Sequence, residues 1–417
     1  MSEEPDEREH LRTAARFSAC LEWPPGEKTF LLGAGEGSFS LYSGSARAFH
    51  FDLEGRLRRA YVDGTHYLRG LDGKVLRKVR LTGSEVAGPS PGAPGDAGEV
   101  RQLYELVHLT VLQALEKLPP SEEPFAQGRA LLALASAFTP EKLELEIERF
   151  REAYAPLSML PPDRYKALIL QATVGCAYGK CAFCSLYRGV RYRRKTPEEF
   201  REHARKVKRF LGKALVLRSG VFLGEANALE LPDVERIVEV VLEEVPDQVR
   251  PGPGRRGGIS AFTDVFQEPF KSREELERLR SMGLDRVYLG LESGDDDVLR
   301  ALRKPATGRS ASRRVDSLKT AGIPVGVIFL VGAGGRGGSR AHVEGTVRLA
   351  EALHLDPGDV VYLSPLYMEG RAGSSGMARE DTLGEDELRA QERELAERLR
   401  TLGIRVSRYD LRSFVYS

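Results

Sequence analysis

Three of the chain's four cysteines stand in the segment Cys176-Ala-Tyr-Gly-Lys-Cys181-Ala-Phe183-Cys184. Isolated core cysteines do not gather in this way, so the spacing indicates a metal centre. Three thiolates hold three irons of a 4Fe–4S cube and leave the fourth iron without a protein ligand. An iron of this kind is open to a substrate or a second cofactor, and the segment therefore predicts an open iron–sulfur site.

Structural zinc is the alternative reading of the same cysteines. A closed zinc site needs four nitrogen or sulfur ligands, and the segment supplies three. The nearest downstream candidate, His203, falls inside a predicted helix at residues 196–211 and lacks finger-like spacing. Cys20 stands alone and predicts a core thiol rather than a ligand. The cluster is favoured, and zinc stays open as an alternative.

From about residue 165, short apolar runs alternate with amphipathic stretches, which is typical of parallel β/α units. The run Val325–Val331 is apolar throughout, as expected of a strand buried on both faces. The predicted strands are Ala167–Gln171, Ala214–Leu217, Gly258–Phe262, Arg286–Leu291, Val325–Val331 and Val360–Leu363. The predicted helices lie near residues 196–211, 231–244, 272–282, 295–302, 309–321, 338–353 and 384–402.

Six such units are too few for an eight-stranded barrel, so the predicted fold class is α/β with a partial (β/α)6 TIM-like barrel. Ligands in such folds bind beyond the carboxyl ends of the strands. The cysteine segment follows the first predicted strand, which places it at that edge.

The first 160 residues lack the strand–helix alternation of the barrel segment and instead predict an α+β accessory module. Short strands separated by Asp63-Gly64 and Asp72-Gly73 indicate hairpins, and helical periodicity follows at residues 100–118 and 141–154. We expect this module to shape or cover the substrate end of the barrel. The predicted organisation is a lead-in at 1–15, the module at 16–160 with a linker at about 84–98, the barrel at 161–370 and a helical extension at 371–417.

Composition excludes several protein classes. The 62 Lys and Arg residues nearly cancel the 61 Asp and Glu residues, so no global field draws the chain to nucleic acid or to an anionic membrane. The acidic start Met1–Glu7 lacks a basic and apolar signal pattern, and no apolar run approaches membrane-spanning length. Few cysteines, gathered together, suit a reducing compartment, and we expect a cytoplasmic location without membrane contact.

With Phe183 just before the last cysteine, the segment resembles the signature of the radical S-adenosylmethionine (radical SAM) superfamily. The first spacing is one residue longer than the family's usual pattern. Further motifs occur in the family's order, each at a predicted strand end, and the resemblance covers residues 165–370. It implies that Cys176, Cys181 and Cys184 bind a 4Fe–4S cluster.

The other motifs imply contacts with S-adenosylmethionine. Leu223-Gly224-Glu225 is similar to the family's Gly-Gly-Glu segment, whose carboxylate and backbone receive the cationic amino group. Glu292 and Ser293 end the fourth strand, where family members bind the ribose hydroxyls. The fifth strand, with Ile328, resembles the segment that holds adenine. Phe183 completes the implied cofactor-binding residues.

The resemblance implies reductive cleavage of S-adenosylmethionine to a 5′-deoxyadenosyl radical, which abstracts hydrogen from an unidentified substrate. The cofactors carry that chemistry, and the protein orients them and excludes water. A low-potential electron donor, a flavodoxin or a ferredoxin, is implied as a partner. The sequence identifies no catalytic residue beyond these sites, and it names no substrate.

Two other functions stay open. The run Arg188–Lys195 interleaves a tyrosine with arginines, a pattern that could contact RNA or phosphate. The chain could then be a non-catalytic RNA- or protein-binding scaffold with a structural metal site. Gly332-Ala-Gly334-Gly335-Arg-Gly337 also fits the dinucleotide fingerprint, with Glu351 as a ribose acceptor, and would suit a nicotinamide-dependent oxidoreductase.

Overall fold

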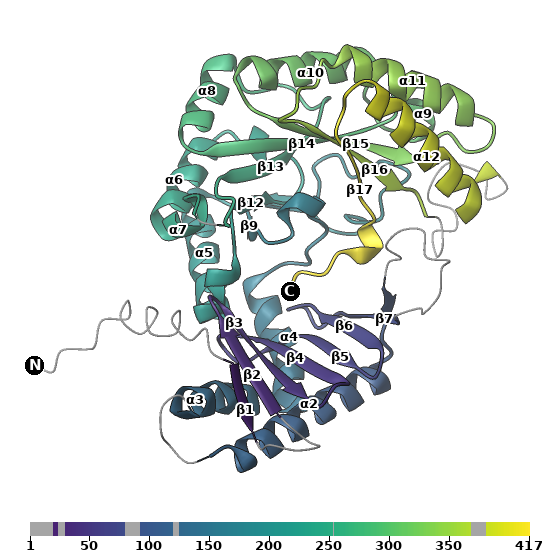
Figure 1. Cartoon of the computed structure of the whole chain (residues 1–417). Coiled ribbons are helices and arrows are strands. Elements are labelled where there is room, and N and C mark those ends of the chain that lie inside the picture. The colour runs from purple at the N-terminus through teal and green to yellow at the C-terminus, as the bar shows by residue number, and fades with distance from the viewer. Residues whose placement is uncertain (1–19, 24–29, 80–91, 120–124, 253, 368–380) are drawn as a thin grey trace, which may run out of the picture. The chain divides into compact units, whose positions relative to one another are not determined.

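The computed structural model describes residues 20–23, 30–79, 92–119, 125–252, 254–367 and 381–417. The chain divides into two compact units (Figure 1). The predicted lead-in at 1–15 and residues 84–91 of the predicted linker lie outside the described residues. Unit 1 takes Met1–Tyr154, Lys206–Arg218 and Arg412–Ser417, and unit 2 takes Ala155–Arg205 and Ser219–Leu411.

Unit 1 contains an antiparallel sheet whose eight described strands follow one another in chain order. The predicted hairpin at Asp63-Gly64 joins β5 to β6, and both residues have a positive φ, as a two-residue hairpin turn requires. The predicted N-terminal module of sheet and helices is confirmed. The strands are β1 (Cys20–Trp23), β2 (Phe30–Gly35), β3 (Ser38–Ser43), β4 (Arg47–Asp52), β5 (Leu57–Val62), β6 (Thr65–Arg69), β7 (Val75–Val79) and β8 (Ala93–Pro94).

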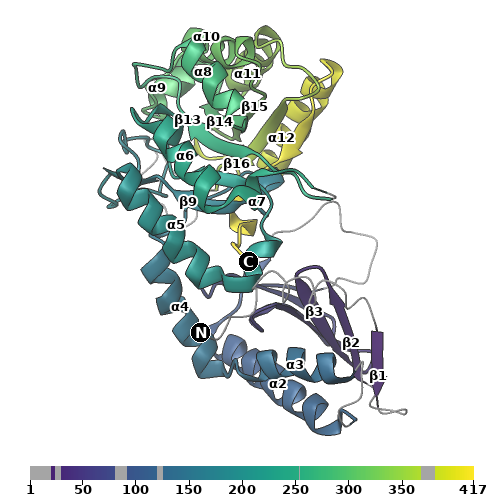
Figure 2. The same cartoon turned by 90° about the vertical axis from the view of Figure 1, so that its left-hand side faces the viewer.

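One face of this sheet is apolar and packs against helices α2 (Ala97–Lys117), α3 (Phe125–Ser136) and α4 (Pro140–Ala153). Alternate residues of the strands point to that face, in keeping with the two-residue period of a strand. Figure 2 shows α2 and α3 side by side on the sheet. The core includes Phe30, Leu32, Phe39, Leu41, Phe49, Phe51, Val107 and Val111.

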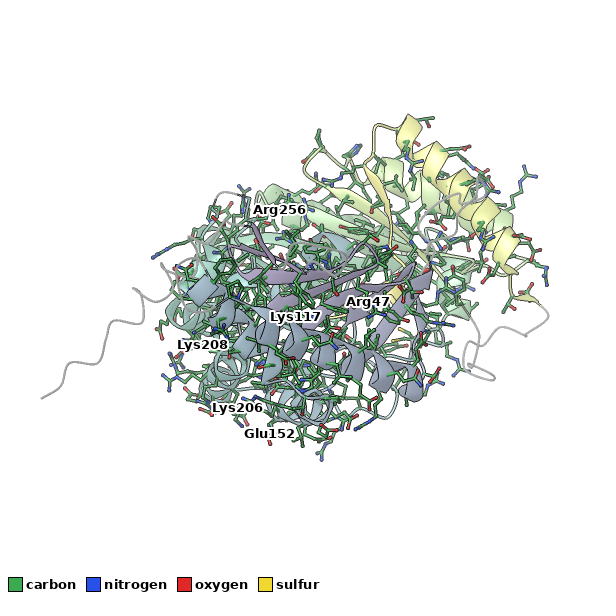
Figure 3. All side chains as sticks on the ribbon, turned by 60° about the horizontal axis from the view of Figure 1, so that its bottom comes forward. Arg47, Lys117, Glu152, Lys206, Lys208 and Arg256 are labelled. Carbon is green, nitrogen blue, oxygen red and sulfur yellow. The ribbon has the colours of Figure 1, made fainter. Side chains whose placement is uncertain are left out.

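Buried Arg56 connects three segments of unit 1. Its Nε donates to Glu146 at 2.7 Å, and its other nitrogens donate to the carbonyl oxygens of Phe210 at 2.5 Å and Leu211 at 3.3 Å. These carbonyls end helix α5 (Pro197–Leu211), so the second half of that helix belongs to unit 1. Lys206 and Lys208 mark this half in Figure 3.

Unit 2 contains a sheet of seven strands in the order β17-β16-β15-β14-β13-β12-β9, and every neighbouring pair is parallel. The predicted α/β class with a parallel sheet is confirmed, and the partial-barrel curvature stays a prediction. Because all neighbouring strands are parallel, the carboxyl ends of the seven strands lie at one edge of the sheet. The strands are β9 (Leu168–Gln171), β12 (Val221–Gly224), β13 (Ile259–Thr263), β14 (Leu284–Glu292), β15 (Val325–Val331), β16 (Val360–Pro365) and β17 (Val406–Arg408).

Helices connect these strands, and their starts follow capping rules. Ser272 and Thr307 each form a capping box, and Asp295 accepts two backbone N–H groups at the start of α9. Figure 1 shows α10 and α11 next to each other along unit 2. The helices are α6 (Val234–Glu244), α7 (Pro246–Val249), α8 (Arg273–Ser281), α9 (Asp296–Ala301), α10 (Gly308–Thr320), α11 (Ser339–Ala352) and α12 (Glu385–Thr401).

Two details of the sheet differ from the sequence prediction. The apolar run Ala214–Leu217 is not a strand, because residues 212–217 form a 3-10 helix that continues α5. The second strand is instead Val221–Gly224, which follows Gly220 at a φ of 78°. A seventh strand, β17, was not predicted, because it is short, lies at the edge of the sheet and lacks an apolar run.

A polar network closes the amino end of the parallel sheet. Asp163 accepts hydrogen bonds from the hydroxyls of Tyr288 at 2.8 Å and Tyr362 at 2.6 Å, and from Arg286 at 2.8 Å. Burial alone would raise the pKa of Asp163, but the tyrosine hydroxyls and the guanidinium groups of Arg164 and Arg286 outweigh it, so the pKa lies below its ordinary value. The network therefore stabilises the charged carboxylate.

None of the described helices combines the length and the apolar character that crossing a membrane requires.

Asp163→Asn should destabilise the protein by about 3 kcal/mol, because it removes the charge on which two tyrosines and three arginines converge. Urea unfolding at neutral pH measures the loss. The gap between parent and variant should narrow as the pH falls below the ordinary Asp value of 3.8, because the lowered folded-state pKa adds stability only while Asp163 is ionised.

Asp386→Asn is the matched control, since Asp386 is 99% exposed in its pair with Arg389 and should change stability by less than about 1 kcal/mol. Equal effects of the two substitutions would contradict this account of the network.

Candidate functional site

The three clustered cysteines lie on a loop that leaves the carboxyl end of β9. A two-stranded antiparallel ribbon, β10 (Thr173–Val174) with β11 (Arg193–Arg194), closes the base of this loop. All three cysteines are free and partly exposed. The Gly179 N–H points to the Cys176 sulfur at 3.5 Å, a backbone donor of the kind that tunes thiolate ligands.

Burial sets the protonation of the thiols. It raises the pKa of Cys181 to about 12, although the Lys304 ammonium acts in the opposite direction. Burial also raises the pKa of Cys184, against the N–H groups of Leu186 and Tyr187. Without a metal these thiols are protonated at neutral pH, so a metal centre that binds them must displace their protons.

The loop is anchored to the segment that follows α9. The Ala182 N–H donates to the Leu302 carbonyl at 2.9 Å, and the Tyr178 hydroxyl donates to the Arg303 carbonyl at 2.7 Å. Phe183 packs against Leu302, Val298, Leu330 and Ala333. Contacts of this kind fix the backbone between the second and third cysteines.

Glu225 lies directly after β12 and is 5% exposed. Its carboxylate accepts hydrogen bonds from Ser158, from Gln171 Nε2 at 3.0 Å and from the Tyr187 hydroxyl at 3.3 Å. Burial raises the pKa of Glu225, and these hydrogen bonds oppose the rise. All three of these donors are neutral, and no described cation donates a hydrogen bond to this carboxylate, although Lys195 interacts with it electrostatically.

Gln171 ends β9 and organises this part of the site. Its backbone N–H donates to His203 Nε2 at 2.9 Å, and its backbone oxygen accepts from Lys195 Nζ at 2.5 Å. His203, the candidate for a fourth zinc ligand, therefore uses its Nε2 as a hydrogen-bond acceptor within the fold. Burial, with Arg193 nearby, lowers the pKa of Lys195 to about 8.

Glu292 ends β14 and forms an ion pair with Lys304, with Oε1 and Nζ 2.8 Å apart and both side chains 8% exposed. A register shift between Gly290 and Glu292 and a φ of 65° at Glu292 form a bulge that redirects this side chain. Burial alone would lower the pKa of Lys304, but Glu292 and Cys181 outweigh it and the pKa is raised. Lys304 is thus charged, and the ion pair lies beside the cysteine loop.

Ser293 and Ile328 occupy different surroundings. The Ser293 hydroxyl lies 2.9 Å from His342 Nδ1 on α11 and accepts the Asp295 N–H at 3.1 Å. Burial lowers the pKa of His342 to about 4, so this imidazole is neutral. Ile328 lies within β15, opposite Gly290 of the neighbouring strand, and is 6% exposed. Gly224, the last residue of β12, is buried beside Gln171.

The parallel sheet brings the cysteine loop, Glu225 and Glu292 to one edge. Sequence analysis missed Lys304, Gln171, Ser158 and Tyr187, which hold the two carboxylates. One signal was available for Gln171, because a polar residue ends an otherwise apolar strand. No three His, Cys, Asp or Glu side chains of the described residues are arranged to hold a single metal ion. A 4Fe–4S cube does not need that arrangement, because each thiolate binds a different iron.

The glycine loop after β15 already has a carboxylate partner. The Gly337 N–H donates to Asp381 Oδ1 at 2.9 Å, and the Arg336 N–H donates to the Asp381 carbonyl at 2.7 Å. Gln391 Oε1 accepts the Gly332 N–H at 2.6 Å. A dinucleotide phosphate would have to displace these acceptors.

Residues 170–350 match the family model described as "Radical SAM superfamily". This range contains the cysteine loop and both carboxylates. The curated proteins contain no match to the chain.

Three solved structures illustrate the likeness, each covering part of the chain. The cobalamin-dependent S-adenosylmethionine radical enzyme OxsB shares 15% identity over 62% of this chain and 33% of its own, with a TM-score of 0.34. Coproporphyrinogen III oxidase (HemN) from Escherichia coli shares 13% identity over 61% and 56%, with a TM-score of 0.43. Methylornithine synthase (PylB) shares 16% identity over 75% and 84%, with a TM-score of 0.38.

The chain thus spans a third of the length of OxsB and 56% of that of HemN. The family match rests on the domain that carries the cysteines. Residues 170–350 of the chain are therefore identified as a radical SAM domain.

Proposed function

We propose that this protein is an enzyme that binds a 4Fe–4S cluster through Cys176, Cys181 and Cys184 and uses S-adenosylmethionine to remove a hydrogen atom from a substrate. When bound, such a cluster supplies the electron that cleaves S-adenosylmethionine to the 5′-deoxyadenosyl radical. One observation carries the proposal: a loop with three free cysteines leaves β9 at the edge where buried carboxylates follow β12 and β14.

The loop fits a cluster with three protein ligands. Its thiols are partly exposed, and its backbone is held by Leu302 and Arg303. The raised pKa of Cys181 means that a bare thiolate is costly there, and iron provides the positive charge that stabilises it. His203 is engaged in the fold, which leaves the zinc alternative without its nearest fourth ligand.

Glu225 is suited to receive the cationic amino group of S-adenosylmethionine. Its carboxylate is buried and is held by neutral donors, and no described cation donates a hydrogen bond to it. An incoming ammonium group would supply that charge and form a charge-assisted hydrogen bond. Gln171 and Tyr187 position the carboxylate for it, and Gly224 allows the backbone to approach.

Glu292 is suited to accept hydrogen bonds from the ribose hydroxyls, because one of its oxygens binds Lys304 and the other has no hydrogen bond from a described residue. The hydrogen bond from Lys304 orients the carboxylate. Ile328 and Phe183 supply apolar contacts for the adenine and for the cluster loop. Ser293 already bonds to His342, so we propose that its part in cofactor binding is to position Glu292.

The alternatives are less well supported. A nicotinamide cofactor on the Gly332–Gly337 loop would compete with Asp381 for the Gly337 N–H. A non-catalytic scaffold has no need for a buried carboxylate such as Glu225, which forms no ion pair with a described residue, because an unpaired buried charge costs stability. The substrate is not identified by any of these residues.

Replacing Cys176, Cys181 or Cys184 by Ala should each abolish iron uptake and the brown absorbance after anaerobic reconstitution, because a cube held by two thiolates is not retained. Parent protein with reductant should release 5′-deoxyadenosine from S-adenosylmethionine. Cys20→Ala is the control and should behave like the parent. Stoichiometric zinc without iron in anaerobically purified protein would contradict the proposal.

Glu225→Gln should keep the cluster and weaken S-adenosylmethionine binding by roughly ten- to hundredfold, as expected for one hydrogen bond to a charged group. Equilibrium dialysis against the reconstituted protein measures the change. Glu277→Gln on the surface of α8 is the control. Parent-like affinity in Glu225→Gln would show that the amino group binds elsewhere.

Glu292→Gln should destabilise the protein by about 3 kcal/mol, because Lys304 is left buried without its partner. The double variant Glu292→Gln/Lys304→Met removes both charges and should recover most of that stability while S-adenosylmethionine binding stays weak. If the double variant binds like the parent, Glu292 serves only to neutralise Lys304 and does not contact the cofactor.

A further inference from the structure

The cysteine loop concentrates positive charge. Residues 176–194 contain Lys180, Arg188, Arg191, Arg193 and Arg194 but no Asp or Glu. The whole chain has a net charge of +1, so the rest of the chain carries a net −4 (+1 minus +5). This local field is therefore a property of the loop and not of the protein as a whole.

Most of these cations are free to meet a partner. Arg188, Arg191 and Arg194 are exposed, and they form no ion pair with any described residue. Arg193 is different, because it pairs with Glu199 at 3.1 Å. Unpaired surface arginines lose little when a partner's carboxylates replace water around them.

The arginine-rich strand that closes the loop lies close to the first cysteine in the chain. In the ribbon at the base of the loop, Arg193 is paired with Val174, two residues before Cys176. The returning strand is so close to Gly175 that a Cβ there would lie 3.2 Å from the Val190 carbonyl oxygen. Exposed Arg303 adds a cation from outside the loop, since its carbonyl accepts the Tyr178 hydroxyl. We name these cations, Lys180, Arg188, Arg191, Arg194 and Arg303, the cysteine-loop surface.

We propose that the cysteine-loop surface docks an acidic protein that carries low-potential electrons, so that reduction enters the site beside Cys176. The inference rests on the function proposed above and adds where the electron donor binds. In each encounter one electron leaves the carrier, which is oxidised, and enters the cluster held by the three cysteines. Complementary charge accelerates such encounters and makes their rate sensitive to salt.

An electron carrier fits this surface better than RNA. Single-stranded RNA sites combine cations with several exposed rings on which successive bases stack. Here Tyr192, at 36%, is the only exposed Phe, Tyr or Trp side chain among the described residues of unit 2. The loop also carries the partly exposed thiols, to which an electron donor must come close and a nucleic acid need not.

The test compares the reconstituted parent with Arg188→Gln/Arg191→Gln/Arg194→Gln. The control Arg309→Gln/Arg313→Gln/Arg348→Gln removes three exposed arginines from α10 and α11, so both variants lose the same net charge. Stopped-flow absorbance follows cluster reduction by a fully reduced acidic flavodoxin and, separately, by reduced methyl viologen, a small cation. The first variant should be about tenfold slower with flavodoxin alone, and added salt should slow the parent toward it.

Parent-like reduction of the loop variant by flavodoxin would overturn the docking site. So would binding of single-stranded oligouridine to the parent that is lost in the loop variant while its flavodoxin rate is unchanged. The docking site would also be overturned if the loop variant were reduced as slowly by methyl viologen as by flavodoxin, because the defect would then lie in the cluster. Failure of the parent to take up iron would instead contradict the proposed function.

Discussion

Parallel pairing of the seven strands from β9 to β17 is the constraint on which the site depends. In a parallel sheet every strand delivers its carboxyl end to the same edge, so residues far apart in the chain become neighbours there. Gln171, Glu225 and Glu292 follow or end three different strands and meet in this way. The cysteine loop joins them only because it leaves the sheet at the end of β9.

This edge of the sheet also contains two buried carboxylates, and the surrounding residues stabilise them in different ways. Glu292 is neutralised by Lys304 within the fold, whereas Glu225 is held by Ser158, Gln171 and Tyr187, which are neutral. An isolated buried carboxylate costs several kcal/mol, and neutral hydrogen bonds recover only part of that cost. An added cation would therefore stabilise Glu225 more than Glu292, which already has an ion-pair partner.

Much of the parallel unit could be predicted from the sequence, because α10 and β15 have clear apolar periods and Thr307 caps the helix. The strand predicted at Ala214–Leu217 was wrong, since a four-residue apolar run fits a 3-10 helix as well as a strand. The pairing of Lys304 with Glu292 could not be predicted, because it depends on a bulge at Gly290 and on the path of the chain after α9. The cysteine pattern identified the loop, whereas its side-chain partners required tertiary structure.

The two ends of the parallel sheet are built for different tasks. At the amino end, Asp163 ties Tyr288, Tyr362 and Arg286 into a network whose charges are mutually compensated. At the carboxyl end, three cysteine thiols are free and partly exposed, and several arginines have no ion-pair partner among the described residues. Uncompensated groups reduce stability, so a fold tolerates them where ligands and partners complete them. The closed end supplies the rigidity that lets the open end remain incomplete until the proposed cofactors and the proposed electron donor bind.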